Sequence, residues 1–267
     1  MVQYASEKKE GGLRTADLLA DASSPTPLVT VITVVRNGEA SLERTITSVL
    51  NQTYEGKEYL IVDGASTDGT LDILRTYDER LDYWVTGPDK GVYDAMNRGI
   101  HLARGMWLIF INAGDVFFDN QALQKTVQYI SDDVDLLYSD TSFYGTRDRV
   151  IRCDHRTMRV IHQSLLYRKS LHGEVGNYLV FRGVTISDYI FFNLLAERRW
   201  RKVGHVIARC DDRGISSHSR TVYQVLAVDL IFKTGGRLNV AFLLLLYPFY
   251  KVLKTLYRGL RHKHSSG

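Results

Sequence analysis

Residues 28–37 read LVTVITVVRN, an apolar and β-branched run that ends in a polar turn at Asn37 and Gly38. The run has the length of one strand and follows Pro27, so it predicts a buried strand at the start of a folded domain. From residue 41 to residue 51 the apolar side chains recur at helical spacing, which predicts a helix directly after the strand.

The alternation of strand and helix continues to residue 111 and weakens beyond residue 120. The expected strands lie at 59–62, 83–85, 106–111, 134–138, 149–152 and 165–167. The expected helices lie around 71–74, 92–103 and 188–198, and Ser66 or Thr67 is the expected cap of the first of these. Repeated strand–helix units favour a mostly parallel sheet with helices on both faces, and ligands bind such sheets at the carboxyl ends of the strands. The predicted fold class is therefore α/β with a Rossmann-like sheet.

Composition and charge limit the class of protein. A chain of 267 residues with 45 % hydrophobic and 24 % charged residues is an ordinary folded protein with a sizeable core. Its two cysteines, Cys153 and Cys210, are expected to be free thiols in a reducing compartment. The net charge of +4 is mild, and the sequence has no Lys/Arg-rich recognition helix and no zinc-ligand pattern. We therefore expect no nucleic-acid partner. Residues 1–27 have no apolar signal segment, so we expect the protein to stay in the cytoplasm.

The chain divides into three parts on the same evidence. Residues 1–27 are expected to form a polar tail, residues 28–225 the main domain, and residues 226–267 a helical C-terminal segment. Within the main domain, residues 28–120 and residues 121–225 are expected to form two halves.

Four segments carry polar residues at the predicted strand ends. They are VVRN (34–37), IVDGASTDGT (61–70), GPDKGVYDAMNRGIHLARG (87–105) and FINAGD (110–115). In that order they resemble the inverting family 2 glycosyltransferases with the GT-A fold, and most of all the bacterial exopolysaccharide and colanic-acid-type branch. HQSLLYR (162–168) and SDYIFFNLL (187–195) extend the resemblance, which covers residues 28–217.

The resemblance implies a nucleotide-sugar donor, a UDP- or GDP-sugar, bound by the first three segments. It makes residues 28–120 the donor half of the domain and residues 121–225 the acceptor half. Asp63 ends a strand before a glycine and can accept hydrogen bonds from a base or ribose. Ser66 is a candidate donor contact in the same motif, and Asp89 lies in a glycine-containing loop that can approach the ribose or diphosphate. Asn97 follows on the next helix as a fourth candidate. Many relatives have two acidic residues where this chain has Asp63 and Gly64, so the sequence leaves the nucleotide open.

A divalent cation, Mg²⁺ or Mn²⁺, is implied at the end of the strand over 106–111. A departing diphosphate builds negative charge, and carboxylate oxygens suit a hard cation that neutralises it. Relatives usually carry an Asp-x-Asp signature here, whereas this chain has Asn112 and Asp115. Asp115 is the expected metal carboxylate and Asn112 a weaker partner.

The catalytic base implied by the resemblance is Asp188. An inverting transfer needs one carboxylate to take the acceptor proton as the hydroxyl attacks the anomeric carbon. An acidic residue at a helix start is also common for electrostatic reasons alone. His162 and Gln163 are candidates for the acceptor side, although a packed histidine is an equally good reading.

The C-terminal segment combines an apolar run with a basic face. Residues 240–250 (VAFLLLLYPFY) would span ~16 Å as a helix, too short to cross a hydrocarbon core of ~30 Å. Basic residues follow at helical spacing without any acidic residue, namely Lys251, Lys254, Arg258 and Arg261. This pattern predicts a helix in the interface of the cytoplasmic membrane. Together with this pattern, the resemblance implies a lipid-linked saccharide as the acceptor. A helix packed on the domain or on a second subunit remains an alternative.

Two other functions fit parts of the sequence. A non-catalytic nucleotide-sugar-binding or scaffold subunit that has lost the metal pair would explain Asn112 and Gly114, but the presence of both Asp115 and Asp188 argues against it. A nucleotidyltransferase would need a glycine-rich loop that cradles a triphosphate, and none opens the domain.

Overall fold

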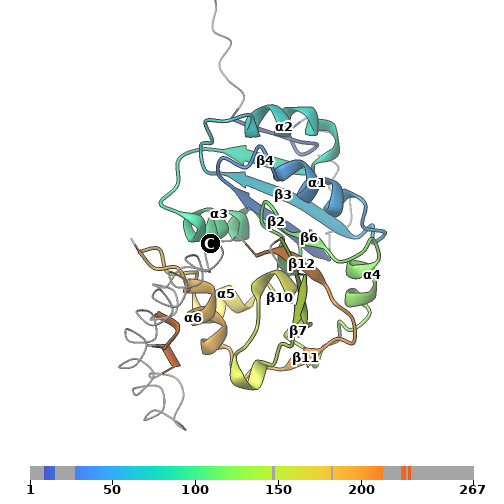
Figure 1. Cartoon of the computed structure of the whole chain (residues 1–267), viewed down its shortest axis with the longest axis vertical. Helices are drawn as coiled ribbons and strands as arrows, with labels where there is room; N and C mark the ends of the chain where they lie inside the picture. Colours follow the sequence, from blue (N-terminus) through green and yellow to red (C-terminus); the bar gives the residue numbers. More distant parts are fainter. Residues whose placement is uncertain are drawn as a thin grey trace, which may run out of the picture.

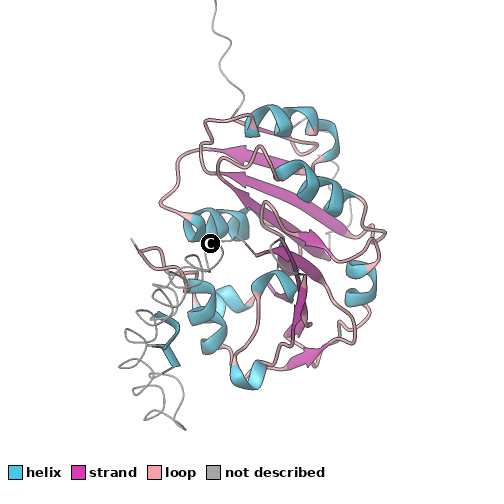
Figure 2. Cartoon of the chain, viewed as in Figure 1, coloured by secondary structure: helices cyan, strands magenta, loops and turns pink. Residues whose placement is uncertain are grey.

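The computed structural model describes residues 9–15, 28–145, 148–181, 183–212, 224–226 and 228–229. Its strands form two sheets (Figures 1 and 2), an eight-stranded sheet in the order β1-β4-β3-β2-β5-β10-β7-β11 and a four-stranded sheet in the order β6-β12-β8-β9. The strands are β1 (Glu10–Gly11), β2 (Val29–Val35), β3 (Lys57–Asp63), β4 (Tyr83–Thr86), β5 (Trp107–Phe110), β6 (Val116–Phe117), β7 (Leu136–Tyr138), β8 (Thr141–Tyr144), β9 (Arg149–Ile151), β10 (Leu165–Arg168), β11 (Trp200–Lys202) and β12 (Ala208–Asp211). The helices are α1 (Leu42–Leu50), α2 (Thr70–Thr76), α3 (Val92–Leu102), α4 (Ala122–Val127), α5 (Leu171–Val175) and α6 (Ser187–Leu194), with short 3-10 turns η1 (Asp78–Arg80), η2 (His155–Thr157) and η3 (His162–Ser164).

The centre of the large sheet is parallel, as predicted. β2 pairs with β3 along its whole length and with β5 on its other side, and β3 pairs in parallel with β4. Every residue of β2 is buried, because helices cover both faces of this strand. The predicted α/β fold with a large sheet flanked by helices is therefore confirmed.

Alternate residues of the central strands face two separate apolar layers. Val31 packs in the layer with α1, α2 and α4, whereas Ile32 packs in the layer with α3, α5 and α6. Gly99 of α3 allows a close approach, since a Cβ there would lie 2.7 Å from the Ile32 side chain. This glycine serves helix packing, and its contact holds α3 against the sheet beside the strand ends.

The sheet changes character beyond β5, which explains why the alternation in the sequence weakens there. β10 lies antiparallel between β5 and β7, and β11 then runs parallel to β7. Several short elements escaped sequence analysis, namely β1, β6, β8, β11, β12, α4 and α5. A two- to four-residue strand such as β12 (ARCD) lacks a long apolar run, so the periodicity that reveals β2 is missing.

The predicted cap of the helix after β3 is wrong. α2 begins at Thr70 and neither Ser66 nor Thr67 caps it. Instead, the Asp68 carboxylate accepts hydrogen bonds from the backbone nitrogen and hydroxyl of Thr70. The Ser66 hydroxyl donates to Asp63 and accepts from the backbone nitrogen of Asn37.

The predicted C-terminal membrane helix lies outside the described residues. The described part of this region consists of helical residues 224–226 and 228–229, where Gln224 accepts from Thr185 N just before α6 and Asp229 accepts from Tyr189 of α6. Among the residues that the structure describes, no helix combines the length and hydropathy needed to span a bilayer.

A buried histidine of α5, in the layer with α3 and α6, makes the stability of the fold depend on pH. The His172 ring stacks on Phe191 with ring centroids 4.3 Å apart and hydrogen-bonds to Tyr167 and to the carbonyl of Gly176. Burial lowers the pKa of His172 from 6.5 to about 4. The folded protein therefore holds the ring neutral where an unfolded chain would protonate it.

We expect His172 to stabilise the fold above pH 6.5 and to lose that contribution as the pH falls toward 4, because protons then bind the unfolded chain preferentially. At about 1.4 kcal/mol per pKa unit, the loss should reach roughly 3 kcal/mol. Urea unfolding of the wild type and of His172→Gln at neutral pH and near pH 4 measures it. Equal pH dependence in the two proteins would contradict this assignment.

Candidate active site

The predicted site residues gather at the edge where the parallel strands end. Asp63 is the last residue of β3, Asp89 follows β4, and Asp115 follows β5. The Asp89 carboxylate lies directly over Gly64, since a Cβ on that glycine would be 2.3 Å from Asp89 Oδ2. The structure thus brings two predicted donor residues to adjacent positions on this edge.

Asp63 and Ser66 fix the loops at this edge. Asp63 is fully buried, and its Oδ1 accepts from Ser66 Oγ at 2.5 Å while its Oδ2 accepts from Ser66 N at 3.0 Å and Thr86 Oγ1 at 2.5 Å. Ser66 Oγ also accepts from the backbone nitrogen of Asn37 at 2.7 Å. These bonds tie β2, β3 and β4 together, and the donor contacts of Asp63 and Ser66 stay a prediction.

Asp89 is the more accessible carboxylate of the pair. It is half-buried, and its Oδ1 accepts from Gly91 N at 2.9 Å in the loop before α3. Asn97 serves a different contact, because its amide donates to the carbonyl of Tyr178 at 2.9 Å and accepts from Tyr178 N at 3.0 Å. Asn97 therefore holds the segment that leads into α6, and a donor contact of its side chain stays a prediction.

Gly64→Ala tests whether Asp89 faces the donor. The added methyl group would clash with the far end of the Asp89 side chain and lie at an ordinary contact distance of 3.5 Å from Arg36 Cβ, so we expect the fold to survive while the carboxylate is displaced. Nucleotide affinity should fall about tenfold, the value of one hydrogen bond to a charged group. Titration of UDP and GDP in calorimetry measures this, with Gly173→Ala, whose Cβ meets nothing within 4 Å, as the control. Unchanged affinity would remove Asp89 from the donor site.

The turn after β5 presents Asn112 and Asp115. Gly114 has a φ of +105°, a backbone angle that favours glycine, and Asp115 N closes the turn on Asn112 O at 2.8 Å. Asp115 is 6 % exposed. Its Oδ2 accepts from Gln163 Nε2 at 2.8 Å and its Oδ1 from Asp211 N at 3.0 Å. The metal carboxylate of the sequence prediction is thus held from two sides.

A second chain of hydrogen bonds runs through Asp188 at the start of α6. Tyr93 of α3 donates to Asp188 Oδ1 at 2.6 Å, and His162 Nδ1 lies 2.8 Å from Asp188 Oδ2. Because the carboxylate can only accept, Nδ1 carries a hydrogen and donates to it, and Nε2 hydrogen-bonds to Asn112 Nδ2 at 3.0 Å. The order Tyr93–Asp188–His162–Asn112 links α6 to the turn that carries Asp115.

The pKa values of Asp188 and Asp115 are shifted in opposite directions. Burial raises the pKa of Asp188, but hydrogen bonds from His162 and Tyr93 outweigh burial and hold that pKa below its usual range. Asp188 is therefore ionised at neutral pH and able to accept a proton. Burial raises the pKa of Asp115 to about 6, against the smaller effect of the hydrogen bond from Gln163. A bound cation would favour its ionised form.

The residues of the turn fit a hard divalent cation. Asn112 Oδ1 is buried and has no hydrogen-bond partner within the described part of the chain. Asp115 uses two of the roughly four lone-pair positions of its carboxylate for the bonds to Gln163 and Asp211. No three His, Cys, Asp or Glu side chains form a metal-binding group among the described residues, so the donor's phosphates and water would complete the coordination.

Sequence analysis missed two residues of this region. Tyr93 belongs to the GPDKGVYDAMN string, so its presence in the motif was the available signal. Asp211 ends β12, which no apolar pattern reveals, and its carboxylate lies 3.9 Å from Arg44. Arg44 also donates to the carbonyl of Gly114 at 3.1 Å and so supports the same turn.

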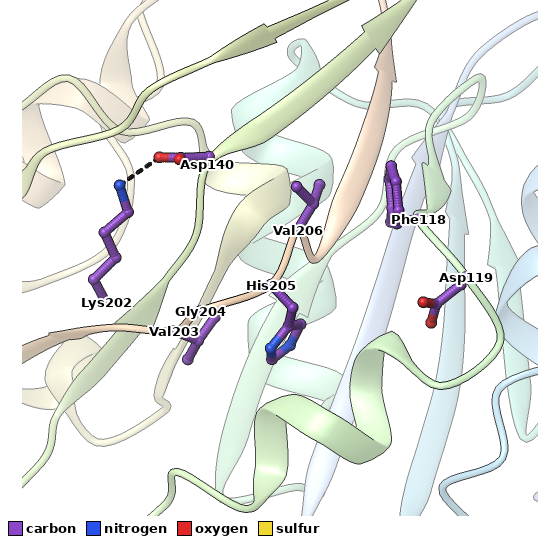
Figure 3. Close-up of a pocket in the computed structure, with 8 residues that line it drawn as sticks. All are labelled: Phe118, Asp119, Asp140, Lys202, Val203, Gly204, His205 and Val206. Carbon is purple, nitrogen blue, oxygen red and sulfur yellow. Dashed lines mark ion pairs between the residues drawn. The ribbon is translucent and has the colours of Figure 1, made fainter.

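A pocket of about 550 Å³ lies elsewhere, at the loop between β11 and β12 and beyond the end of β6. Figure 3 shows its lining residues, among which Lys202 pairs with Asp140. His205 comes from the loop between β11 and β12, and Phe118 directly follows β6. None of the residues in the two hydrogen-bonded chains lines it. The chemistry of the strand ends therefore does not involve this pocket.

Comparison with known proteins agrees with the fold and with the family that the sequence motifs resemble. A family model described as glycosyl transferase family 2 matches residues 30–188, more than half of the chain. The chain therefore belongs to glycosyl transferase family 2 and is a glycosyltransferase.

Curated relatives support the same family. A PGL/p-HBAD biosynthesis glycosyltransferase of Mycobacterium bovis is 34 % identical over 175 residues, which cover 62 % of this chain and 68 % of the relative. An uncharacterized glycosyltransferase of Mycobacterium tuberculosis is 28 % identical over 207 residues, 72 % of this chain and 78 % of the relative.

Solved structures share the fold at low identity. S. aureus TarS 1–349 in complex with UDP-GlcNAc matches with a TM-score of 0.65 and 18 % identity, over 76 % of this chain and 65 % of that chain. The mannosyltransferase PcManGT from Pyrobaculum calidifontis, in complex with GDP-Man and Mn²⁺, matches with a TM-score of 0.54 and 18 % identity, over 78 % and 62 % of the two chains. This chain thus spans just under two thirds of each structure, and these likenesses show the fold alone.

Proposed function

We propose that the protein transfers a sugar from a nucleoside-diphosphate sugar to an acceptor hydroxyl with inversion at the anomeric carbon. Structural neighbours with the same fold hold UDP-GlcNAc or GDP-Man, which supports a donor of this class. Sequence motifs at the strand ends support the same donor.

One observation carries the proposal. Two adjacent residues of η3 bind two acids of different roles, because His162 contacts Asp188 and Gln163 contacts Asp115. An ionised carboxylate suited to take a proton thus stands beside a turn suited to a cation and a diphosphate. A transferase needs both at one reaction centre.

The reaction assigns one role to each acid. The acceptor oxygen attacks the anomeric carbon, the bond from that carbon to the diphosphate oxygen breaks, and the nucleoside diphosphate leaves with the bonding electrons. Asp188 takes the proton of the acceptor hydroxyl. Asp115 and Asn112 would hold Mg²⁺ or Mn²⁺, which neutralises the charge of the leaving diphosphate when it is bound. The Mn²⁺ of the PcManGT complex supports this cation.

The donor side would use the loop over Gly64. Asp89 is the accessible carboxylate there, while Asp63 and Ser66 keep the loops at the ends of β2, β3 and β4 in place. This arrangement supports a contact of Asp89 with the ribose or base, and it leaves the choice between UDP- and GDP-sugars to measurement.

The acceptor we propose is a lipid-linked saccharide at the cytoplasmic face of the membrane, in the assembly of a bacterial surface polysaccharide. Support comes from the sequence resemblance to the exopolysaccharide and colanic-acid-type branch, and from the apolar run 240–250 with the basic residues after it. Flotation with anionic vesicles should retain the protein at low salt and release part of it at high salt. Absence of binding to anionic vesicles would contradict the membrane location.

The experiment that tests the function is a donor panel. The full chain is incubated with UDP- and GDP-sugars, Mn²⁺ and a saccharide–lipid acceptor preparation, and the released nucleoside diphosphate is measured. We expect acceptor-dependent release with one class of donor. Release with none of the donors, in a protein that still binds UDP or GDP, would favour the non-catalytic alternative.

A further inference from the structure

The turn η3 contacts both acids that the proposed reaction uses. His162 and Gln163 are neighbours in the chain, yet their side chains bind Asp188 of α6 and Asp115 after β5 respectively. Sequence analysis assigned both residues to the acceptor side. Their side chains contact the two acids, and a contact with the acceptor stays a prediction.

The turn is anchored in the rigid centre of the fold. Ser164 N donates to Ile161 O at 2.9 Å, and Ser164 O accepts from Ser139 N at 3.1 Å. β10 follows directly and pairs with β5 and β7 inside the large sheet, where Leu165 is fully buried. A side chain on η3 therefore has a defined position relative to the sheet.

The acids themselves reach the site from less central elements. Asp188 stands at the start of α6, and the preceding loop is held through Ser187 Oγ, which accepts from Leu179 N at 2.5 Å. Asp115 follows a tight turn outside β5. Each acid needs a contact with the sheet to keep a constant distance from the other.

We propose that η3 fixes the position of the base relative to the metal carboxylate, with His162 as the positioning residue of Asp188 and Gln163 as that of Asp115. The inference rests on the proposed function of these two acids. His162 donates through Nδ1 to the base and is itself oriented by Asn112 at Nε2. Gln163 donates through Nε2 to Asp115 and leaves lone pairs of that carboxylate for the cation.

The two residues should give opposite kinetic signatures although they are adjacent. Asp188 acts on the acceptor proton in the transition state, so a loss at His162 lowers kcat and leaves nucleotide affinity unchanged. Asp115 acts on the cation and diphosphate, so a loss at Gln163 weakens nucleotide binding in Mn²⁺. Supporting contacts of this kind typically contribute about 10–100-fold.

A matched pair of variants separates positioning from packing. His162→Asn keeps a nitrogen donor at the place of Nδ1, whereas His162→Gln keeps a polar group at the place of Nε2 and removes the donor to Asp188. We expect His162→Gln to lower kcat about 10–100-fold and His162→Asn to restore most of it. Exposed His101→Asn serves as the control and should behave as the wild type.

Gln163→Ala completes the experiment, with exposed Gln128→Ala as its control. Calorimetric titration of UDP and GDP with MnCl₂ should show about 10–100-fold weaker binding for Gln163→Ala and no change for His162→Gln, which keeps a polar group beside Asn112. Melting temperatures show that all variants are folded.

Three results would overturn the inference. They are equal kcat for His162→Asn and His162→Gln, a raised acceptor KM with unchanged kcat in the His162 variants, and unchanged nucleotide affinity in Gln163→Ala. Asp188→Asn distinguishes this failure from failure of the proposed function. If Asp188→Asn is inactive while the His162 variants behave alike, the positioning role alone is wrong, whereas an active Asp188→Asn removes the proposed base.

Discussion

Replacing Asp188 with asparagine is expected to lower transfer by about 10²–10⁴-fold while nucleotide binding stays close to that of the wild type. The amide is isosteric with the carboxylate but cannot take the acceptor proton. Tyr93 and His162 hold Asp188 at 2.6 and 2.8 Å, and these contacts lie on the α6 side of the site. Single-turnover rates and calorimetric titration of UDP or GDP in Mn²⁺ measure the two effects separately.

The result is informative only if the variant keeps its structure. Tyr93 can still donate to an amide oxygen, so we expect a melting temperature near that of the wild type. A loss of less than tenfold in turnover would mean that another residue takes the proton.

Asp115→Ala is expected to weaken nucleotide binding in Mn²⁺ and to abolish the difference in activity between Mn²⁺ and excess chelator. Of the two proposed cation ligands, the variant keeps the Asn112 amide oxygen and loses the carboxylate, so the diphosphate charge is poorly neutralised. It also removes a carboxylate that holds Gln163 and the backbone of Asp211. Titration of UDP or GDP with and without MnCl₂ measures the loss.

Asp119→Ala is the matched control, because this aspartate is exposed and pairs with Lys125 on the surface. It should retain both nucleotide affinity and metal dependence. If the wild type itself transfers equally well in excess chelator, the cation is not required. The Asn112–Asp115 turn would then have to hold the diphosphate without a metal.

The centre of the fold could be predicted because its strands are long and buried on both faces. β2 and β3 are strands of seven residues; β2 is apolar and β-branched, β3 contains the apolar run 59–62, and periodicity distinguishes both from the helix between them. The antiparallel pairing of β10 and the existence of the short β12 could not be predicted. Pairing between distant segments depends on tertiary contacts. A pattern within one segment does not reveal such contacts.

The site shows the same limit. The strand-end acids were found from their positions in the motifs, and the structure places Asp89 and Asp115 at the expected edge. The hydrogen bonds of Asp188 could not be predicted, since Tyr93 lies 95 residues and His162 lies 26 residues from Asp188 in the chain. Asn97 illustrates the difference, because its amide reaches the backbone of Tyr178, 81 residues away.

The stereochemistry of the product tests the central claim most directly. Asp188 is proposed as a base that deprotonates the acceptor, so the hydroxyl attacks opposite the departing diphosphate and the configuration inverts. The measurement is the ¹H NMR spectrum of the product formed by the wild type from an α-linked nucleotide sugar identified in the donor panel. The proposed mechanism predicts a β-glycoside in the first spectrum recorded. An α-glycoside would show retention and would contradict the role assigned to Asp188.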